Sequence, residues 1–316
     1  MVLAIVCPGQ GSQSPGFLSQ WLELPGVKEH LERLSESAQL DLVKHGTESD
    51  ADTIKDTAVA QPLIVAAGLV AARVLLEGKP AAANGTAGVV LAGHSVGEIT
   101  ASALAGALTE DDAIAFVRER ANAMADAAAR TPTGMSAVLG GDPEEVLTAI
   151  DNAGLTAANA NGAGQIVAAG TLEQLQNLAD NPPAKARVIP LKVAGAFHTR
   201  HMASAAVALE ELRPRISPAA PTLPLLSNYD GGRVTSGEAN LDSLIAQVSR
   251  PVRWDLCMEE FKTLGVNGLI ELPPAGTLAG LAKRGMPGVA TAALKNPNDL
   301  GAARDMIKTD AVEEGA

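Results

Sequence analysis

Blocks of apolar and mixed residues alternate along the chain and predict alternating strands and helices. Residues 2–7 and 89–92 are short, continuous apolar runs, which are typical of strands buried on both faces. Residues 61–76 are apolar almost all round, as expected of a buried helix. Mixed helical patterns cover 17–40 and 110–129, the second preceded by a capping box of Thr109 and Asp112. This alternation predicts an α/β fold.

Shorter elements follow between residues 131 and 193. The pattern there predicts, in order, a strand (135–139), a helix (143–152), two strands (155–159 and 165–169), a helix (172–179) and a strand (187–192). This β-α-β-β-α-β order is that of a ferredoxin-like unit. We therefore expect a large α/β unit of residues 1–130 and 194–316, interrupted by a ferredoxin-like small subdomain at 131–193. Residues 80–88 are predicted to be a linker and the tail from about Asp310 to be frayed.

Composition narrows the possible partners and location. The net charge of −12 argues against binding to nucleic acid, which needs a positive field. Only Cys7 and Cys257 are present, too few for a disulfide framework. No basic residue precedes the first apolar run, and no later run reaches spanning length unbroken, so we expect a cytoplasmic protein without a membrane segment.

A candidate nucleophile lies between a strand and a helix. Gly93-His94-Ser95-Val96-Gly97 matches G-x-S-x-G, in which glycines permit the sharp turn that exposes the serine. The helix N-terminus and the N–H of Val96 could stabilise an oxyanion beside it. A five-residue pattern of this kind also occurs by chance. The prediction therefore depends on its position directly after an apolar strand.

Five histidines are candidates for the general base that a serine needs. His30 and His45 lie among charged residues and are expected to be solvated, and the ring of His94 should point away from Ser95. His198, beside the bulky Phe197 where the chain returns to the large unit, is preferred over His201. No aspartate accompanies it, so another group, such as a backbone carbonyl, must orient the imidazole.

Arg120 lies on the apolar face of its predicted helix, between Val117 and Met124, without an acidic neighbour three or four positions away. An unpaired buried charge is costly, so it must meet an anion. Two anions are candidates: the carboxylate of an Asp or Glu distant in sequence, and a substrate carboxylate bound by the guanidinium. The sequence leaves both open.

The chain resembles the malonyl-CoA:acyl carrier protein transacylase family over nearly its whole length. The motifs that carry the resemblance are Gly9-Gln10-Gly11-Ser12-Gln13, Gly93-His94-Ser95-Val96-Gly97-Glu98, Arg120 with Met124, Asn159-x-Asn161 with Gln165, Gly195-Ala196-Phe197-His198, and Gln247-x-x-x-Pro251-Val252-Arg253-Trp254. Pro273-Pro274-Ala275 stands where the family commonly has Gly-Pro-Gly.

The resemblance implies an α/β-hydrolase-like core with an inserted ferredoxin-like subdomain. It also implies malonyl transfer from coenzyme A to the phosphopantetheine thiol of acyl carrier protein, with no metal and no cofactor. Fatty-acid synthesis is the expected destination, and polyketide synthesis is left open as a second one. The residue roles it implies are Ser95 as acyl carrier, His198 as base, Gln10 and Val96 as oxyanion hole, Arg120, Phe197, Asn159 and Gln165 as substrate contacts, and the Gln247 carbonyl as orienter of His198.

Two other functions remain open to the sequence. A serine hydrolase could use Ser95 and His198, although it would not need Arg120. A nucleotide-binding module could use Gly9-Gln10-Gly11, but no lysine follows and the pattern lacks G-x-G-x-x-G. We expect a monomer, with carrier docking on basic residues near the motifs; the candidates are Arg200, Arg250, Arg253, Lys283 and Arg284.

Overall fold

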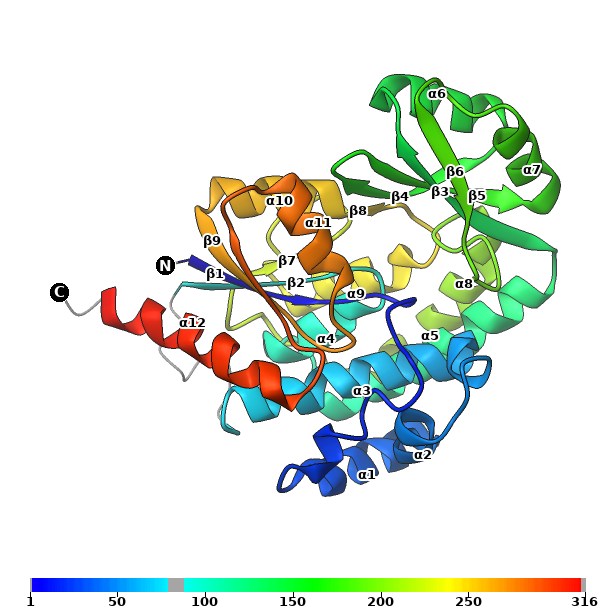
Figure 1. Ribbon diagram of the computed structural model, residues 1–316. Helices are drawn as coiled ribbons and strands as arrows, with labels where there is room; N and C mark the ends of the chain where they lie inside the picture. Colours follow the sequence, from blue (N-terminus) through cyan, green and yellow to red (C-terminus); the bar gives the residue numbers. More distant parts are fainter. Residues whose placement is uncertain (1, 79–87, 314–316) are drawn as a thin grey trace.

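The computed structural model describes residues 2–78 and 88–313, which form two five-stranded sheets (Figure 1). The larger sheet has the order β10-β9-β1-β2-β7, and every pairing in it is parallel. Its strands are β1 (Val2–Cys7), β2 (Val89–Gly93), β7 (Leu225–Leu226), β9 (Val266–Glu271) and β10 (Ala290–Ala293). The mixed α/β fold that the pattern predicts is confirmed.

Helices cover both faces of the larger sheet, which explains why β1 and β2 are apolar throughout. Leu3 and Ile5 join one core with residues of α1, α3, α4, α5, α8 and α9, whereas Ala4 and Val6 join another with residues of α10 and α11. The bounds are α1 (Val27–Ala38), α2 (Leu42–Thr47), α3 (Thr57–Leu75), α4 (Gly97–Leu104), α5 (Glu110–Ala129), α8 (Ala203–Leu212), α9 (Gly237–Gln247), α10 (Trp254–Thr263), α11 (Thr277–Gly285) and α12 (Leu300–Glu313).

Within the described residues, α3 is the one helix long and apolar enough to cross a membrane by length and composition. Of its most apolar 18-residue stretch, 78 % is buried inside the protein. The helix packs against α5 in the larger core, so its apolarity is explained by burial.

The second sheet has the order β6-β3-β5-β4-β8. Its elements are β3 (Thr133–Gly140), α6 (Pro143–Asn152), β4 (Thr156–Gly162), β5 (Gln165–Thr171), α7 (Leu172–Asp180), β6 (Ala186–Pro190) and β8 (Val252–Arg253). One face packs on α6 and α7 through residues such as Val138 and Leu175, and Met135 and Val167 join the larger core. β8 comes from later in the chain and pairs with β4 in parallel. We keep the division into 1–130 with 194–316 and 131–193 as a proposal.

Some predicted bounds were wrong. No single helix covers 17–40, because Pro25-Gly26 interrupts it and α1 begins only at Val27. Thr109 accepts the backbone N–H of Asp112, but only this half of the predicted capping box is present. Helix α12 continues to Glu313, past the point at which the tail was expected to fray. The predicted linker lies, apart from Gly88, outside the described residues.

Candidate active site

Ser95 sits at the carboxyl edge of the larger sheet, in the turn between β2 and α4. Its φ of 53° is in the left-handed region, which non-glycine residues rarely adopt outside strained turns. The turn packs tightly on the neighbouring chain. A β-carbon on Gly97 would lie 2.1 Å from the carbonyl oxygen of Cys7, and one on Gly93 would lie 2.1 Å from the carbonyl carbon of Gly97. The two glycines of the motif are therefore required for close approach.

Replacing Gly97 with alanine is expected to lower the free energy of unfolding by about 3 kcal/mol or more, since the added methyl group meets rigid backbone. Gly301 in α12 has no atom within 4 Å of the same position and is exposed, so Gly301→Ala is the control and should stabilise the helix by up to about 1 kcal/mol. Urea unfolding of both variants measures the difference. Equal stabilities would contradict the close packing of the turn.

His198 lies against Ser95, although 103 positions separate the two in sequence. Its Nε2 is 2.7 Å from Ser95 Oγ, and its Nδ1 is 2.8 Å from the backbone oxygen of Gln247. A carbonyl only accepts, so Nδ1–H donates to Gln247, and Nε2 is left to accept the serine proton. Such a pair can activate a hydroxyl for attack on a carbonyl carbon.

The pKa of His198 is lowered to about 3, chiefly because the ring is buried and secondly because Arg120 is close. The imidazole is therefore neutral at neutral pH, as a base must be. Below the ordinary histidine pKa, the unfolded chain takes up a proton that the folded protein does not. The stability that neutral His198 contributes is complete above about pH 6.5 and is lost as the pH falls towards 3.

Comparison of the wild type with His198→Asn tests this sign. Asparagine does not titrate, and it tolerates the left-handed conformation that His198 adopts at φ 61°. Between pH 7 and pH 5 the wild type should lose about 2 kcal/mol of unfolding free energy relative to the variant. A difference that stays constant over this interval would show that the folded protein protonates His198 normally.

Arg120 projects from α5 towards Ser95 and is fully buried. Its Nη1 donates to Gln61 Oε1 at 2.6 Å, and its Nη2 donates to Gln247 Oε1 at 2.8 Å and reaches Ser95 Oγ at 3.4 Å. No carboxylate of the described chain forms an ion pair with it. The alternative of a directly paired structural carboxylate therefore finds no support among these residues.

A cavity of about 100 Å³ opens onto Ser95. Gln10, Val96, Phe197 and Asn159 line it, together with apolar side chains from the second sheet such as Met135. The backbone N–H groups of Gln10 and Val96 have no acceptor among the described residues, so they are available to an oxyanion. The buried Oδ1 of Asn159 likewise lacks a partner there.

Gln165 is not brought to this cavity. It lies at the beginning of β5 and lines a neighbouring cavity of about 500 Å³ with Pro251, Arg253 and Asp255. A role in binding the substrate stays a prediction for this residue.

The surroundings of the other four histidines match the predictions only in part. His94 does point away from Ser95, with Nε2 2.9 Å from Asn161 Oδ1 in β4. His45 is half-buried against Ser49, and the N–H of the half-buried His201 is capped by Thr199. The prediction that His30 is solvated was wrong, since it is only 5 % exposed.

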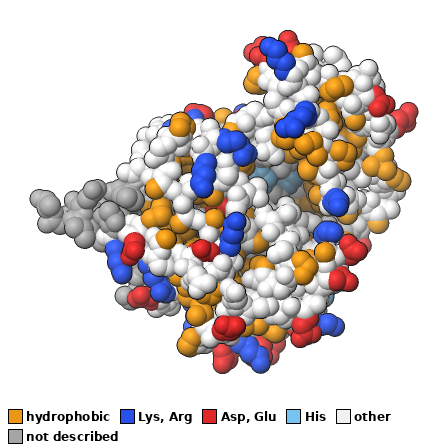
Figure 2. All heavy atoms as spheres, viewed as in Figure 1, with side chains coloured by type: hydrophobic (Ala, Val, Ile, Leu, Met, Phe, Trp, Pro, Cys, Tyr) orange, Lys and Arg blue, Asp and Glu red, His pale blue; other side chains and the backbone are white. Residues whose placement is uncertain are grey.

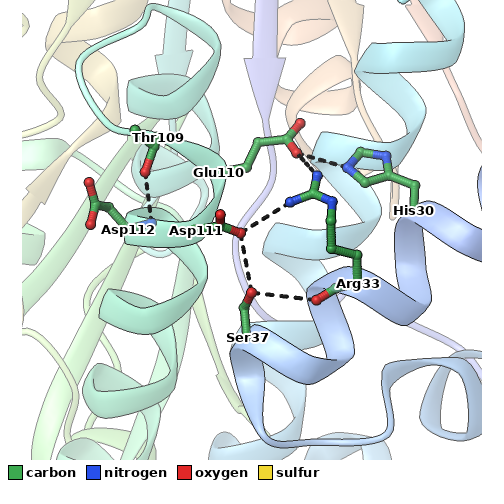
Figure 3. A network of polar contacts seen from close by, with 7 residues as sticks. All are labelled: His30, Arg33, Ser37, Thr109, Glu110, Asp111 and Asp112. Atoms are coloured by element: carbon green, nitrogen blue, oxygen red, sulfur yellow. Dashed lines mark hydrogen bonds and ion pairs between the residues drawn. The ribbon is translucent and has the colours of Figure 1, made fainter.

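Figure 3 shows the reason for the burial of His30. Its Nε2 lies 2.9 Å from Glu110 Oε2, and Arg33 binds both Glu110 and Asp111. The charged neighbours of His30 thus form a network that joins α1 to the first turn of α5, the helix that carries Arg120.

Two features of the site were not anticipated. Gln61, a polar residue inside the apolar helix α3, holds one end of the Arg120 guanidinium. The loop at Pro273-Pro274-Ala275 is anchored by Glu271, whose buried carboxylate accepts the N–H groups of Gly276, Leu278 and Ala279. Within the described residues, no three His, Cys, Asp or Glu side chains gather as a metal site.

The fold and this site match a known class of proteins. The acyl transferase domain family model matches residues 4–297. The chain therefore belongs to the acyl transferases.

Individual relatives narrow the class. A malonyl CoA-acyl carrier protein transacylase of Mycobacterium tuberculosis (strain H37Rv) is 51 % identical over 95 % of this chain and 98 % of its own, and one of Escherichia coli (strain K12) is 31 % identical over 96 % and 99 %. The crystal structure of MCAT from Mycobacterium tuberculosis has a TM-score of 0.91 at 50 % identity, covering 96 % of this chain and 99 % of that one. A malonyl-transacylase solved in complex with a type II PKS acyl-carrier protein has a TM-score of 0.90 at 29 % identity, covering 97 % and 100 %. Within the acyl transferases, the chain belongs to the malonyl CoA-acyl carrier protein transacylase family.

Proposed function

We propose that the protein transfers malonyl from coenzyme A to the phosphopantetheine thiol of acyl carrier protein, through an ester on Ser95, and so supplies fatty-acid synthesis. The observation that carries the proposal is Arg120, a buried guanidinium that reaches Ser95 Oγ at 3.4 Å and is bound by no carboxylate of the residues that the structure describes. It is placed to hold the free carboxylate of a malonyl group whose thioester carbon faces Ser95.

The first half-reaction forms the ester. As Ser95 Oγ attacks the thioester carbon, its proton passes to His198 Nε2, and the oxyanion accepts from the N–H groups of Gln10 and Val96. The carbon–sulfur bond then breaks, and His198 returns the proton to the coenzyme A thiolate. The carrier thiol reverses these steps, which gives a ping-pong cycle.

Arg120 also affects the base. Its positive charge is one cause of the low pKa of His198, and a malonyl carboxylate bound to the guanidinium would offset that charge. Binding of the correct acyl group therefore makes His198 a stronger base at the moment the reaction needs it.

Basic side chains on the surface around the site would favour docking of a carrier protein that is acidic. Figure 2 shows Lys and Arg side chains around a hollow in which histidine is visible, on a chain of net charge −12. Of the docking candidates, Arg200, Arg250, Lys283 and Arg284 are exposed, whereas Arg253 is half-buried and bound to Asp255. We propose docking on the exposed four, by a monomer in the cytoplasm.

Transfer and hydrolysis are separated by their products. Malonyl-CoA with holo-carrier should give malonyl-carrier, with little free malonate, because a small and largely apolar cavity disfavours water as the acceptor. Malonate released at the same rate with and without carrier would support the serine hydrolase instead.

A further inference from the structure

Glu98, which ends the Ser95 motif, takes no part in the chemistry described so far. Its side chain is fully buried at the beginning of α4. The carboxylate accepts the backbone N–H of Asn228 at 3.2 Å and the side-chain Nε2 of Gln247, and no ion pair among the described residues includes it. A buried charge without a direct counter-ion is costly, so its position calls for an explanation.

The Gln247 amide joins Glu98 to Arg120. Its Nε2 donates to Glu98, and its Oε1 accepts from Arg120 Nη2 at 2.8 Å. Burial raises the pKa of Glu98 to about 7. In its ionised form the carboxylate only accepts and the guanidinium only donates, so the amide then satisfies both partners in one orientation alone. Glu98 therefore fixes the direction in which Gln247 presents its oxygen to Arg120.

Glu98 places a negative charge near Arg120 without itself binding the guanidinium N–H groups. Attraction to Glu98 counteracts the lowering of the Arg120 pKa by burial. The guanidinium Nε still has no partner among the described residues, and Nη2 still reaches Ser95 Oγ. A carboxylate in direct contact would compete with the substrate for the same donors.

We propose that Glu98 is a positioning residue for the substrate carboxylate, acting through the Gln247 amide to hold Arg120 charged, oriented and free to bind. The proposal rests on the proposed function, because it needs Arg120 to receive a malonyl carboxylate. It predicts that Glu98 affects acyl groups that carry a carboxylate far more than those that do not.

Glu98→Gln tests this selectivity. Acylation of Ser95 should show kcat/KM for malonyl-CoA reduced by about 30-fold, mainly through a higher KM, because an amide no longer imposes one orientation on Gln247. The slow acylation by acetyl-CoA should change by less than about 3-fold, because an acetyl group has no carboxylate for Arg120 to bind. Equal losses for the two substrates would mean that Glu98 only maintains the fold, and would overturn the proposal.

The exchange variant Glu98→Gln/Gln247→Glu is the second test. It keeps the net charge of the protein, so it can be used if Glu98→Gln alone fails to fold. It moves the carboxylate onto Arg120 and leaves the backbone oxygen that orients His198 in place. Malonylation should fall at least about 300-fold below the wild type, because the exchanged carboxylate pairs directly with the Arg120 donors that the substrate needs. Wild-type malonylation rates in this variant would overturn the proposal, whereas a wild-type protein that never acylates Ser95 would instead sink the proposed function.

Discussion

Replacing Arg120 with alanine is expected to lower kcat/KM for malonylation of Ser95 by about 10³-fold, because the malonyl carboxylate then enters a buried site without a partner. The wild type should prefer malonyl-CoA over acetyl-CoA by about 10⁴-fold, since an acetyl group leaves the guanidinium unpaired. The variant should lose most of this preference, as acetylation no longer carries that penalty. Rates of acyl-enzyme formation with each thioester measure both effects.

Arg118 provides the matched control on the same helix. It is half-buried and donates to the backbone oxygen of Ala58, away from Ser95. Arg118→Ala should keep the wild-type preference, even if its stability falls. If Arg120→Ala kept it too, the guanidinium would not be the group that recognises the carboxylate.

Ser95→Ala is expected to reduce malonyl transfer to the carrier by at least about 10⁴-fold, because the ester on its oxygen is the proposed intermediate. The binding groups remain, so malonyl-CoA should still bind. Ser37 is half-buried in α1 and donates to Asp111, so Ser37→Ala should transfer at the wild-type rate. Transfer by Ser95→Ala at more than a few per cent of the wild-type rate would point to direct attack by the carrier thiol.

The sequence was sufficient to predict those features that depend on residues adjacent in the chain. The turn at Ser95 follows from an apolar strand, two glycines and a helix, and these adjoin in sequence. The burial of Arg120 follows from the apolar stripe of α5. Ferredoxin-like order was visible in the succession of short strands and helices between residues 131 and 193.

Contacts between distant segments were not predictable in the same way. The burial of His30 depends on α5 packing over α1, and its charged neighbours in sequence indicated the opposite. Gln61 could have been recognised as a polar residue inside an apolar helix, but its partner lies 59 positions away. The two-residue strand β8 is too short to leave a periodic pattern.

The hydrogen bonds that connect Glu98 to Arg120 through Gln247 could not be predicted for the same reason. The motif containing Glu98 was evident, as was Gln247, whose backbone role the family resemblance implied. That the side chain of Gln247 also joins the two charges appears only when α4, α5 and α9 are brought together.

Intact mass after mixing the protein with malonyl-CoA tests the central claim most directly, with acetyl-CoA and Ser95→Ala in parallel. The account predicts a gain of one malonyl group on the wild type, little acetyl adduct, and no malonyl adduct on Ser95→Ala. A malonyl adduct on Ser95→Ala, or malonyl-carrier formed by a wild type that never carries the adduct, would contradict an acyl-enzyme at Ser95.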